Sequence, residues 1–316
     1  EVIYPSPGFP IYESFIRYVR ALPVPLHLEE PANFTFSPEQ LENLITPRTK
    51  LIYLNFPSNP TGGVAGKELL DVTAKVILER CHPNVRVYSD EIYENIIFDG
   101  QQHRSISSVP EMEERTIIAG GFSKTYAWTG GRIGYAVFPT VKEADIFKTL
   151  NINYFSCVPP YNQEAAKEAL ENPLSKVAVK EMVETFEARR NLIWRQINEI
   201  PGITCQKPGG AFYLFPNISG VCENLGLIEK HQRLSKEQQS SPDNIFQMFA
   251  LYEHQVAVLD RKSFGQIGAD GKYFLRLSIA ADQAVLEEGV RRLKAASEDL
   301  SGLDKFLKER PDLIPA

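Results

Sequence analysis

The chain has 316 residues, 43% of them hydrophobic and 23% charged, which is enough apolar sequence to bury a large core and predicts two lobes. Its formal net charge of −6, with acidic and basic residues interspersed, supplies no basic stripe of the kind that contacts phosphate backbones, so we expect no nucleic acid partner. No apolar run approaches the roughly 20 residues of a membrane-spanning helix, and no basic, apolar leader opens the chain, so we expect no membrane association.

The four cysteines are far apart in the sequence, at positions 81, 157, 205 and 222. They show neither a CxxC spacing nor a nearby pair of histidines, so we expect no metal site. Unpaired thiols are typical of proteins kept in a reducing compartment. We therefore expect buried, reduced cysteines in a cytoplasmic protein.

The first half of the chain alternates short β-branched runs with amphipathic segments. The runs that predict strands are residues 2–4, 50–56, 85–90, 115–120 and 133–138. The segments that predict helices are residues 11–22, 37–45 and 66–80. The second helix opens with Ser37, Pro38 and Gln40, the signature of a capping box with proline at the first helical position. Apolar strands separated by helices predict a mostly parallel sheet covered by helices.

After Pro160 the pattern changes to long helices, of which the clearest covers residues 180–200. Within it, the segment 187–190 is most simply a solvated face of the helix. The later predicted elements are a non-helical segment at residues 203–215, a polar, solvated insertion at 220–244, a helix at 241–255, strands at 256–260 and 273–280, and a helix from Asp282. Together they predict a smaller α+β lobe.

Three polar clusters each follow the carboxyl end of a predicted strand. They are residues 55–63 (NFPSNPTGG), 89–94 (SDEIYE) and 121–126 (GFSKTY). In an open α/β sheet, ligands bind in the crevice outside those strand ends. We therefore expect the three clusters to meet at one site.

The chemistry of these clusters describes a ligand. A lysine such as Lys124, at the end of a buried strand, is desolvated, which lowers its pKa and frees the amine to form a Schiff base with an aldehyde. Asp90 is costly to bury unless it meets a cation such as a protonated ring nitrogen. Ser123 and Arg132 are donors that a phosphate dianion favours, and the Gly130–Gly131 pair allows the backbone to approach it closely. An aldehyde, a basic ring nitrogen and a phosphate together describe pyridoxal 5'-phosphate.

The segment SKTYAWTGGRIG carries a resemblance to a known family. It matches the pattern Ser-Lys-x-x-x-x-x-Gly-x-Arg-x-Gly at Ser123, Lys124, Gly130, Arg132 and Gly134. The chain thus resembles the class I/II aminotransferases of fold type I. The resemblance implies a three-layer α/β domain with a mostly parallel sheet that binds pyridoxal 5'-phosphate, followed by a smaller α+β domain. We expect these domains at residues 1–170 and 171–316.

The resemblance also implies roles for residues that bind the cofactor. Lys124 would hold it as an internal aldimine and shuttle the substrate proton. Asp90 would pair with the pyridinium nitrogen, while Tyr93 and Asn59 would bond the phenolic oxygen. Phe9, in PSPGFPIY, would stack on the ring, and Ser123 and Arg132 would bind the phosphate as inferred above.

The resemblance implies a reaction and its substrates as well. Arg276, in FLRLSIA, stands where the family binds the substrate α-carboxylate, and Asn59 would assist it. We therefore expect transfer of an amino group between an L-amino acid and a 2-oxo acid (EC 2.6.1). The family's active site lies between two subunits, so the resemblance also implies a homodimer.

Other interpretations of the same residues exist. Taken singly, Asp90 could cap a helix, Tyr93 could be a core side chain and Asn59 a turn residue. Within the resemblance, the alternatives are another fold type I enzyme, such as a C–S lyase or an aminocyclopropane carboxylate synthase, or a non-catalytic regulatory domain. The formation of pyruvate and ammonia without an acceptor would indicate a lyase.

The sequence departs from the family pattern at three places. The family has an N-terminal segment that helps to bind the phosphate, and we expect it to be lacking before Glu1. Asp260 and Arg261 stand where the family commonly has Pro-Gly, so we expect a different loop before Arg276. Trp128 is also bulkier than the usual aliphatic residue at its position.

Overall fold

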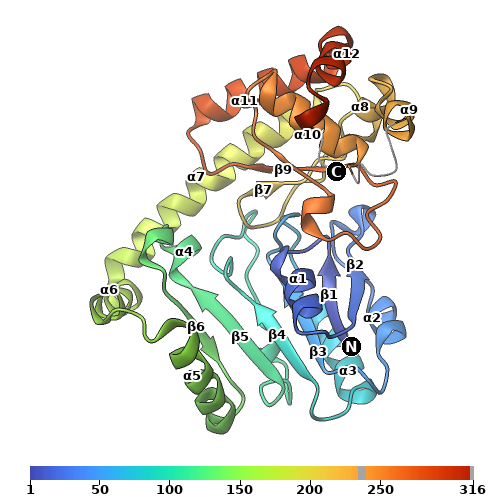
Figure 1. Cartoon of the computed structure of the whole chain (residues 1–316). Coiled ribbons are helices and arrows are strands. Elements are labelled where there is room, and N and C mark those ends of the chain that lie inside the picture. Colours follow the sequence, from blue (N-terminus) through green and yellow to red (C-terminus); the bar gives the residue numbers. More distant parts are fainter. Residues whose placement is uncertain (234–239, 314–316) are drawn as a thin grey trace.

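The computed structural model describes residues 1–233 and 240–313 and contains two β-sheets, with the long helix α7 (Pro173–Asn198) running from the side of the larger sheet to the smaller one (Figure 1). The larger sheet has the strand order β2-β1-β3-β4-β5-β6. Its strands are β1 (Val2–Ser6), β2 (Pro23–His27), β3 (Leu51–Asn55), β4 (Arg86–Asp90), β5 (Thr116–Gly121) and β6 (Gly134–Val137). All neighbours are parallel except β5 and β6, which confirms the predicted mostly parallel α/β sheet.

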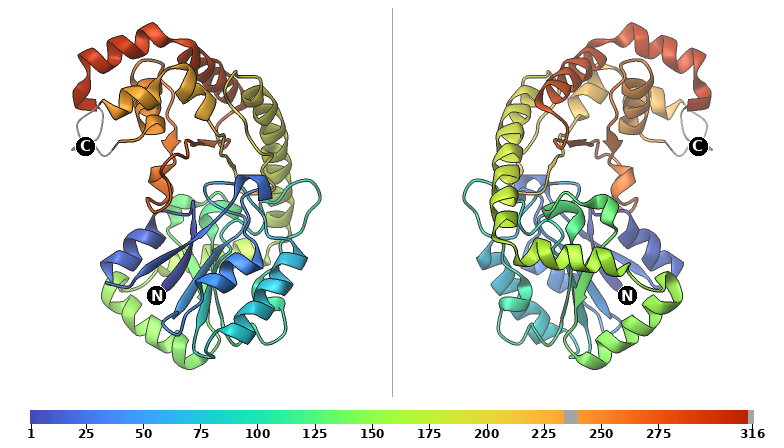
Figure 2. Two further views of the ribbon diagram at one scale, coloured as in Figure 1. Left: turned by 90° about the vertical axis from the view of Figure 1, so that its right-hand side faces the viewer. Right: turned by 90° about the vertical axis from the view of Figure 1, so that its left-hand side faces the viewer.

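Helices cover both faces of this sheet (Figure 2). α1 (Ile11–Tyr18) and α5 (Val141–Phe155) lie on one face, and α2 (Pro38–Leu44) and α3 (Lys67–Arg80) pack together on the other. The face of the central strands toward α2 and α3 is fully buried, as at Ile52, Leu54 and Val87, whereas side chains on the opposite face, such as Tyr53 and Tyr88, are partly buried.

The local signals of α1 and α2 can be compared with the structure. The capping box of α2 is confirmed, because the Ser37 hydroxyl accepts from the Gln40 amide and the Gln40 side chain accepts from the Ser37 amide. α1 ends at Tyr18 rather than at residue 22. Arg20 adopts a left-handed conformation (φ 59°), which turns the chain into β2.

β2, which contains Pro23 and Pro25, was not predicted from the sequence. The amide of Leu28 donates to the Ser6 carbonyl, so the even-numbered amides of this segment point toward β1. The odd-numbered positions point outward, and the two prolines therefore remove no hydrogen bond from the sheet. This placement is possible because β2 is an edge strand.

The smaller sheet is antiparallel, with the order β7-β9-β8. Its strands are β7 (Tyr213–Leu214), β8 (Leu259–Asp260) and β9 (Leu275–Ser278). The helices that follow β6 are, besides α5 and α7, α6 (Pro160–Glu171), α8 (Ser219–Asn224), α9 (Leu227–Gln232), α10 (Pro242–Tyr252), α11 (Gln283–Glu298) and α12 (Leu300–Glu309). The second half is thus α+β, as predicted, and its division from the first half at residue 170 stays a prediction.

The prediction of a solvated insertion at residues 220–244 is wrong for its first part, and also for its end, where Ser240, Ser241 and Asp243 are buried. Residues 219–232 form α8 and α9. Val221, Cys222 and Leu227 are fully buried in the hydrophobic core that they share with α10 and β9. Gly226, with φ 61°, separates the two short helices, so their apolar residues follow no single helical period. Residues 234–239 of the predicted insertion lie outside the described part of the chain.

The prediction of a solvated face at residues 187–190 is wrong for Arg190. Its side chain is fully buried in α7 and donates to both carboxylate oxygens of Asp99 at 2.9 Å. The guanidinium also lies over the ring of Phe98, 4.7 Å from the ring centroid. A charged side chain can be buried here because a carboxylate and an aromatic face both receive it.

Three of the four cysteines are buried, as predicted, but Cys157 is exposed. Burial raises the pKa of the Cys81 thiol to about 11 and that of Cys205 to about 12. Buried thiols of this kind stay protonated and unreactive at neutral pH. No helix within residues 1–233 and 240–313 is both long and apolar enough to span a membrane.

The burial of Arg190 leads to a stability prediction. Arg190→Met should lower the free energy of unfolding by about 3 kcal/mol, because the Pro208 carbonyl loses this donor and the Asp99 carboxylate keeps only its bond from Lys207. Its neighbour Arg189 faces Asp282, whose side chain is exposed, so Arg189→Met should cost less than about 1 kcal/mol. Urea unfolding of the two variants would make the comparison, and equal losses would contradict the assignment.

Candidate active site

The register of the parallel strands brings the three polar clusters together. Asn55 at the end of β3 stands opposite Asp90 at the end of β4, and Asp90 stands opposite Ala119 of β5. The side-chain amide of Asn55 donates to the Asp90 carbonyl at 3.0 Å and accepts from the Asn59 backbone amide at 3.0 Å. The clusters therefore leave the sheet at one edge, as the sequence predicts.

Asp90 is a partly buried carboxylate at this edge. Its side chain accepts from the hydroxyl of Tyr12 at 2.6 Å and from the backbone amide of Ile92 at 3.3 Å. Burial raises the pKa of Asp90, and the bond from Tyr12 acts in the opposite direction. The carboxylate is thus held in place by donors while it lacks the solvation of a surface group.

Tyr12 is a site residue that the sequence analysis missed. Its ring stacks on Tyr53 with centroids 4.8 Å apart and meets Phe9 edge to face at 5.9 Å. Phe9 itself lies two residues before α1 and is 41% exposed. Phe9 and Tyr12 are three residues apart, which places both side chains on the same side of the turn that leads into α1. This spacing was the sequence signal that could have identified Tyr12.

Lys124 lies in the single turn α4 (Phe122–Thr125), directly after β5. The amine is half-buried and lies 5.6 Å from the ring centroid of Phe212. Burial lowers the pKa of Lys124, and the positive charges of Arg276 and Arg132 lower it further. The amine is therefore easier to deprotonate than that of a surface lysine.

Arg276 on β9 is held from two sides. Its guanidinium donates to the Asn59 side chain at 2.9 Å, and its central carbon lies 4.4 Å from the ring centroid of Tyr213 and 4.9 Å from that of Phe264. Among the described residues, the bond to Asn59 is the one hydrogen bond of this guanidinium. Its other N–H groups remain available to an anion.

Tyr93 and Tyr213 form a buried pair of hydroxyls 2.9 Å apart. Burial raises the pKa of Tyr93, and the neighbouring Tyr213 adds to the effect. Since Arg276 lies over Tyr213, this pair connects the end of β4 with β9. The sequence singled out Tyr93 but gave no reason to choose Tyr213 from the other aromatic residues.

Ser123 lies next to Lys124 in α4 and is partly buried, whereas Arg132 is exposed at the end of the turn formed by residues 129–131. The Arg132 guanidinium donates to the Thr129 carbonyl at 3.0 Å, and the Thr129 hydroxyl donates to the Ser123 carbonyl at 3.0 Å. A side chain at Gly131 would have its Cβ 2.3 Å from the indole of Trp128. Gly131 is thus required by packing against Trp128, a reason other than the close approach to a ligand that we expected.

One set of possible metal ligands occurs within the described residues, at Glu91, Glu94 and His103. The Glu91 carboxylate already accepts from the Ser105 hydroxyl and is bonded to the His103 ring at 2.8 Å. These bonds tie the segment after β4 to the later loop. They account for the buried carboxylate without a metal ion.

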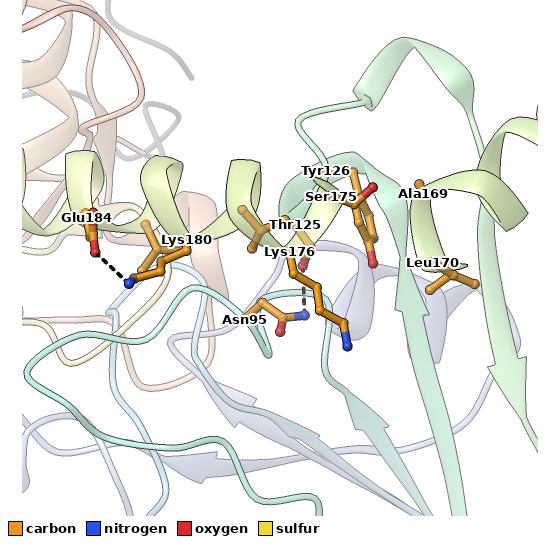
Figure 3. Close-up of a pocket in the computed structure, with 11 residues that line it drawn as sticks. Asn95, Thr125, Tyr126, Ala169, Leu170, Ser175, Lys176, Lys180 and Glu184 are labelled. Atoms are coloured by element: carbon orange, nitrogen blue, oxygen red, sulfur yellow. Dashed lines mark hydrogen bonds and ion pairs between the residues drawn. The ribbon is translucent and has the colours of Figure 1, made fainter. Parts of the chain in front are cut away.

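A groove of about 430 Å³ lies between α4 and α7 (Figure 3). Thr125, the residue that follows Lys124, lines it. Asn95 and Thr125 point toward each other across it with a bond of 3.5 Å, and Lys180 points toward Glu184 on α7. None of the eight predicted site residues lines this groove. It is separate from the site at the strand ends.

The raised pKa of Asp90 predicts how stability depends on pH. A carboxyl group whose pKa is higher in the folded state lowers the free energy of unfolding above that pKa, and the penalty disappears as the pH falls toward the unfolded value of about 3.9. Asp90→Asn, without added ligand, should therefore be more stable than the parent at pH 7, with a smaller gain at pH 5. Urea unfolding at both values would measure this, with the exposed Asp145→Asn as a control that changes little. A gain that grows toward pH 5 would contradict the sign.

Comparison with known proteins places this geometry in a family. The family profile described as aminotransferase class I and II matches residues 1–293. The aromatic-amino-acid aminotransferase 2 of Thermococcus litoralis is 35% identical over 98% of this chain and 70% of its own length. The aspartate aminotransferase of Bacillus subtilis is 36% identical over 93% of this chain and 69% of its own length.

Solved structures agree with the sequence comparison. The crystal structure of an aromatic aminotransferase from Pyrococcus horikoshii superposes with a TM-score of 0.81 at 33% identity, and covers 95% of this chain and 74% of that protein. Its similarity extends the agreement from the sequence to the fold. The chain therefore belongs to the class I and II aminotransferases, with the fold type I architecture that the resemblance implied.

Proposed function

We propose that this aminotransferase uses pyridoxal 5'-phosphate to transfer an amino group between an L-amino acid and a 2-oxo acid. The observation that carries the proposal is the meeting of three groups at the strand ends: the Lys124 amine, the Asp90 carboxylate and the Arg276 guanidinium. The Asn55 side chain bonds both the Asp90 carbonyl and the Asn59 amide, and the Asn59 side chain bonds Arg276. The Lys124 amine lies 5.6 Å from the ring of Phe212, and the ring of the next residue, Tyr213, lies beneath Arg276. These contacts connect the three groups.

The donor set of the site fits this cofactor. Asp90 is a desolvated carboxylate that has no cationic hydrogen-bond partner within the described part of the chain, and a protonated ring nitrogen would supply one. Ser123, partly buried in α4, offers a hydroxyl and the exposed Arg132 offers a guanidinium, both suited to a phosphate. Phe9 presents a partly exposed aromatic face beside Tyr12, suited to stacking on a planar ring.

Lys124, Asp90 and Tyr12 have different roles in the proposed reaction. When bound, the cofactor supplies the electron sink for the bond broken at the substrate Cα. Lys124 would anchor the cofactor covalently and, once the substrate amine has displaced it, would take the Cα proton at Nζ, which its lowered pKa favours. Asp90 would keep the ring nitrogen of the cofactor protonated, and Tyr12 holds that carboxylate in place. Both substrates use the same site in turn, which gives ping-pong kinetics.

Arg276 selects substrates with an α-carboxylate. Its bond to Asn59 and its position over Tyr213 fix the plane of the guanidinium, so that a carboxylate can meet it with two parallel bonds. The relatives are named for aspartate and for aromatic amino acids, and both classes are candidates for this chain. Neither the lyase nor the regulatory alternative gains support from these comparisons.

We also propose a homodimer in the cytoplasm. Support for a second copy comes from apolar side chains exposed on β6 and α5, where Val137, Val141, Phe147 and Phe155 are each at least 48% exposed. Apolar surface of this kind is typical of subunit interfaces.

Lys124→Ala should lower turnover by several orders of magnitude, because the amine serves both as the attachment point and as the base. Treatment of the parent with borohydride and the cofactor should add its mass to the peptide that contains Lys124. Lys75→Ala, at an exposed position of α3, is the control and should keep normal turnover. Near-normal turnover of Lys124→Ala would falsify the assignment.

Arg276→Lys should raise KM for the amino acid and for the 2-oxo acid by roughly tenfold or more, since both carry the carboxylate and lysine cannot bind it with two parallel bonds. Arg292, which pairs with Glu288 on α11, gives a matched control in Arg292→Lys. Steady-state kinetics with both substrates would check this, and an effect on one substrate alone would argue against a shared carboxylate site.

A further inference from the structure

The segment between β8 and β9 reaches from the smaller sheet to the start of the chain (Figure 2). We call residues 261–267 the clasp loop. It contacts the turn between β1 and α1, where the Gly8 amide donates to the Phe264 carbonyl at 2.9 Å. The Gln266 amide donates to the Glu13 carboxylate at 3.0 Å. Two segments more than 250 positions apart in the sequence are therefore bonded directly.

Arg261 opens the clasp loop and is 1% exposed. Its guanidinium donates to the Gly265 carbonyl within the loop at 2.8 Å and to the Ser6 hydroxyl of β1 at 3.0 Å. Its backbone amide donates to the buried carboxylate of Asp243 at 2.9 Å. One side chain thus closes the loop on itself and attaches it to the larger sheet.

The charge of Arg261 persists in this buried position. Burial lowers the pKa of Arg261 to about 10, while the acidic groups of Asp243, Glu13 and Asp260 favour the charged form. The side chain is therefore a cation at neutral pH, and its bonds to Gly265 and Ser6 are charge-assisted. Such bonds resist displacement more than neutral ones do.

The clasp loop also carries Phe264, which is 1% exposed. Its ring centroid lies 4.9 Å from the central carbon of the Arg276 guanidinium and 6.1 Å from the ring of Phe215. The position of Phe264 follows from the loop around it, since its carbonyl is bonded to Gly8 and Arg261 holds Gly265. The same loop therefore touches the neighbour of Phe9 and the carboxylate-binding arginine.

We propose that Arg261 is a positioning residue for substrate recognition: by fixing the clasp loop to Ser6, it holds Phe264 against Arg276 and so sets the affinity for the substrate α-carboxylate. The proposal rests on the assignment of Arg276 under the proposed function. Arg261 itself contacts neither substrate nor cofactor, so its effect is on KM rather than on the chemical step.

Two variants test the clasp from opposite ends. Ser6→Ala removes one partner of Arg261 and leaves the buried cation its bond to Gly265, so the fold is retained. Arg261→Lys keeps the charge but cannot bond Gly265 and Ser6 in one plane. Each should raise KM for the amino acid and for the 2-oxo acid by about fivefold to thirtyfold, with kcat changed by less than about threefold.

The control is Lys262→Ala, in the same loop. Lys262 is partly exposed and its partner Asp270 is 94% exposed, so its removal should leave both constants unchanged. A second readout uses a primary amine without a carboxylate as a slow donor. If Arg261 acts through Arg276, Ser6→Ala should lower the rate of transamination with the amino acid at concentrations below KM. The rate with this amine should stay as in the parent protein.

The outcomes separate the inference from the proposed function. A parent protein that transaminates, together with unchanged KM values in Ser6→Ala and Arg261→Lys, would overturn the role of the clasp alone. Equal losses with the amine and the amino acid would show a general structural defect and would also overturn it. A parent protein with cofactor but without any transamination would instead overturn the proposed function.

Discussion

The parallel register of β3, β4 and β5 is the constraint on which the rest of the site depends. Each of these strands ends at the same edge of the sheet, with Asn55 opposite Asp90 and Asp90 opposite Ala119. The polypeptide has to leave the sheet there, and the polar residues after each strand consequently share one volume. Reversal of any one strand would carry its cluster to the far end of the molecule. The catalytic arrangement is therefore a property of strand direction before it is a property of any side chain.

Three arginines show how the molecule accommodates cations away from water. Arg190, Arg261 and Arg276 each bond through the guanidinium plane, and Arg190 and Arg276 also lie over aromatic rings. The first two use their donors on carboxylates, carbonyls or hydroxyls of the protein, so they hold segments together. Arg276 keeps donors for an incoming anion. The number of guanidinium bonds made within the protein thus distinguishes these structural arginines from the one that is suited to recognise a ligand.

Much of the fold was predictable because its signals are local. The apolar strands, the capping box at Ser37 and the polar clusters after the strands all appear within a few residues, and the parallel order follows from the alternation with helices. The burial of Arg190 and Arg261 was not predictable, since their partners Asp99 and Ser6 lie 91 and 255 positions away. α8 and α9 were missed because each is too short to show a period. The roles of the individual site residues were inferred from the family resemblance and remain predictions.

Tyr12 and Tyr213 show the same limit within the site. Each is one aromatic residue among many, and only its hydrogen bond to Asp90 or Tyr93 gives it importance. Those bonds span 78 and 120 positions, respectively. Sequence patterns located the charged groups of the site, whereas the groups that hold them in place became evident from the assembled fold.

The prolines of β2 make the two margins of the larger sheet unequal. At Pro23 and Pro25 the outward positions carry no N–H, so a foreign strand that approached this margin would find two donors missing. β6, at the opposite margin, contains no proline and keeps its donors. Growth of the sheet, whether by a native strand or by misassembly of partly folded chains, is therefore directed to one side of the molecule.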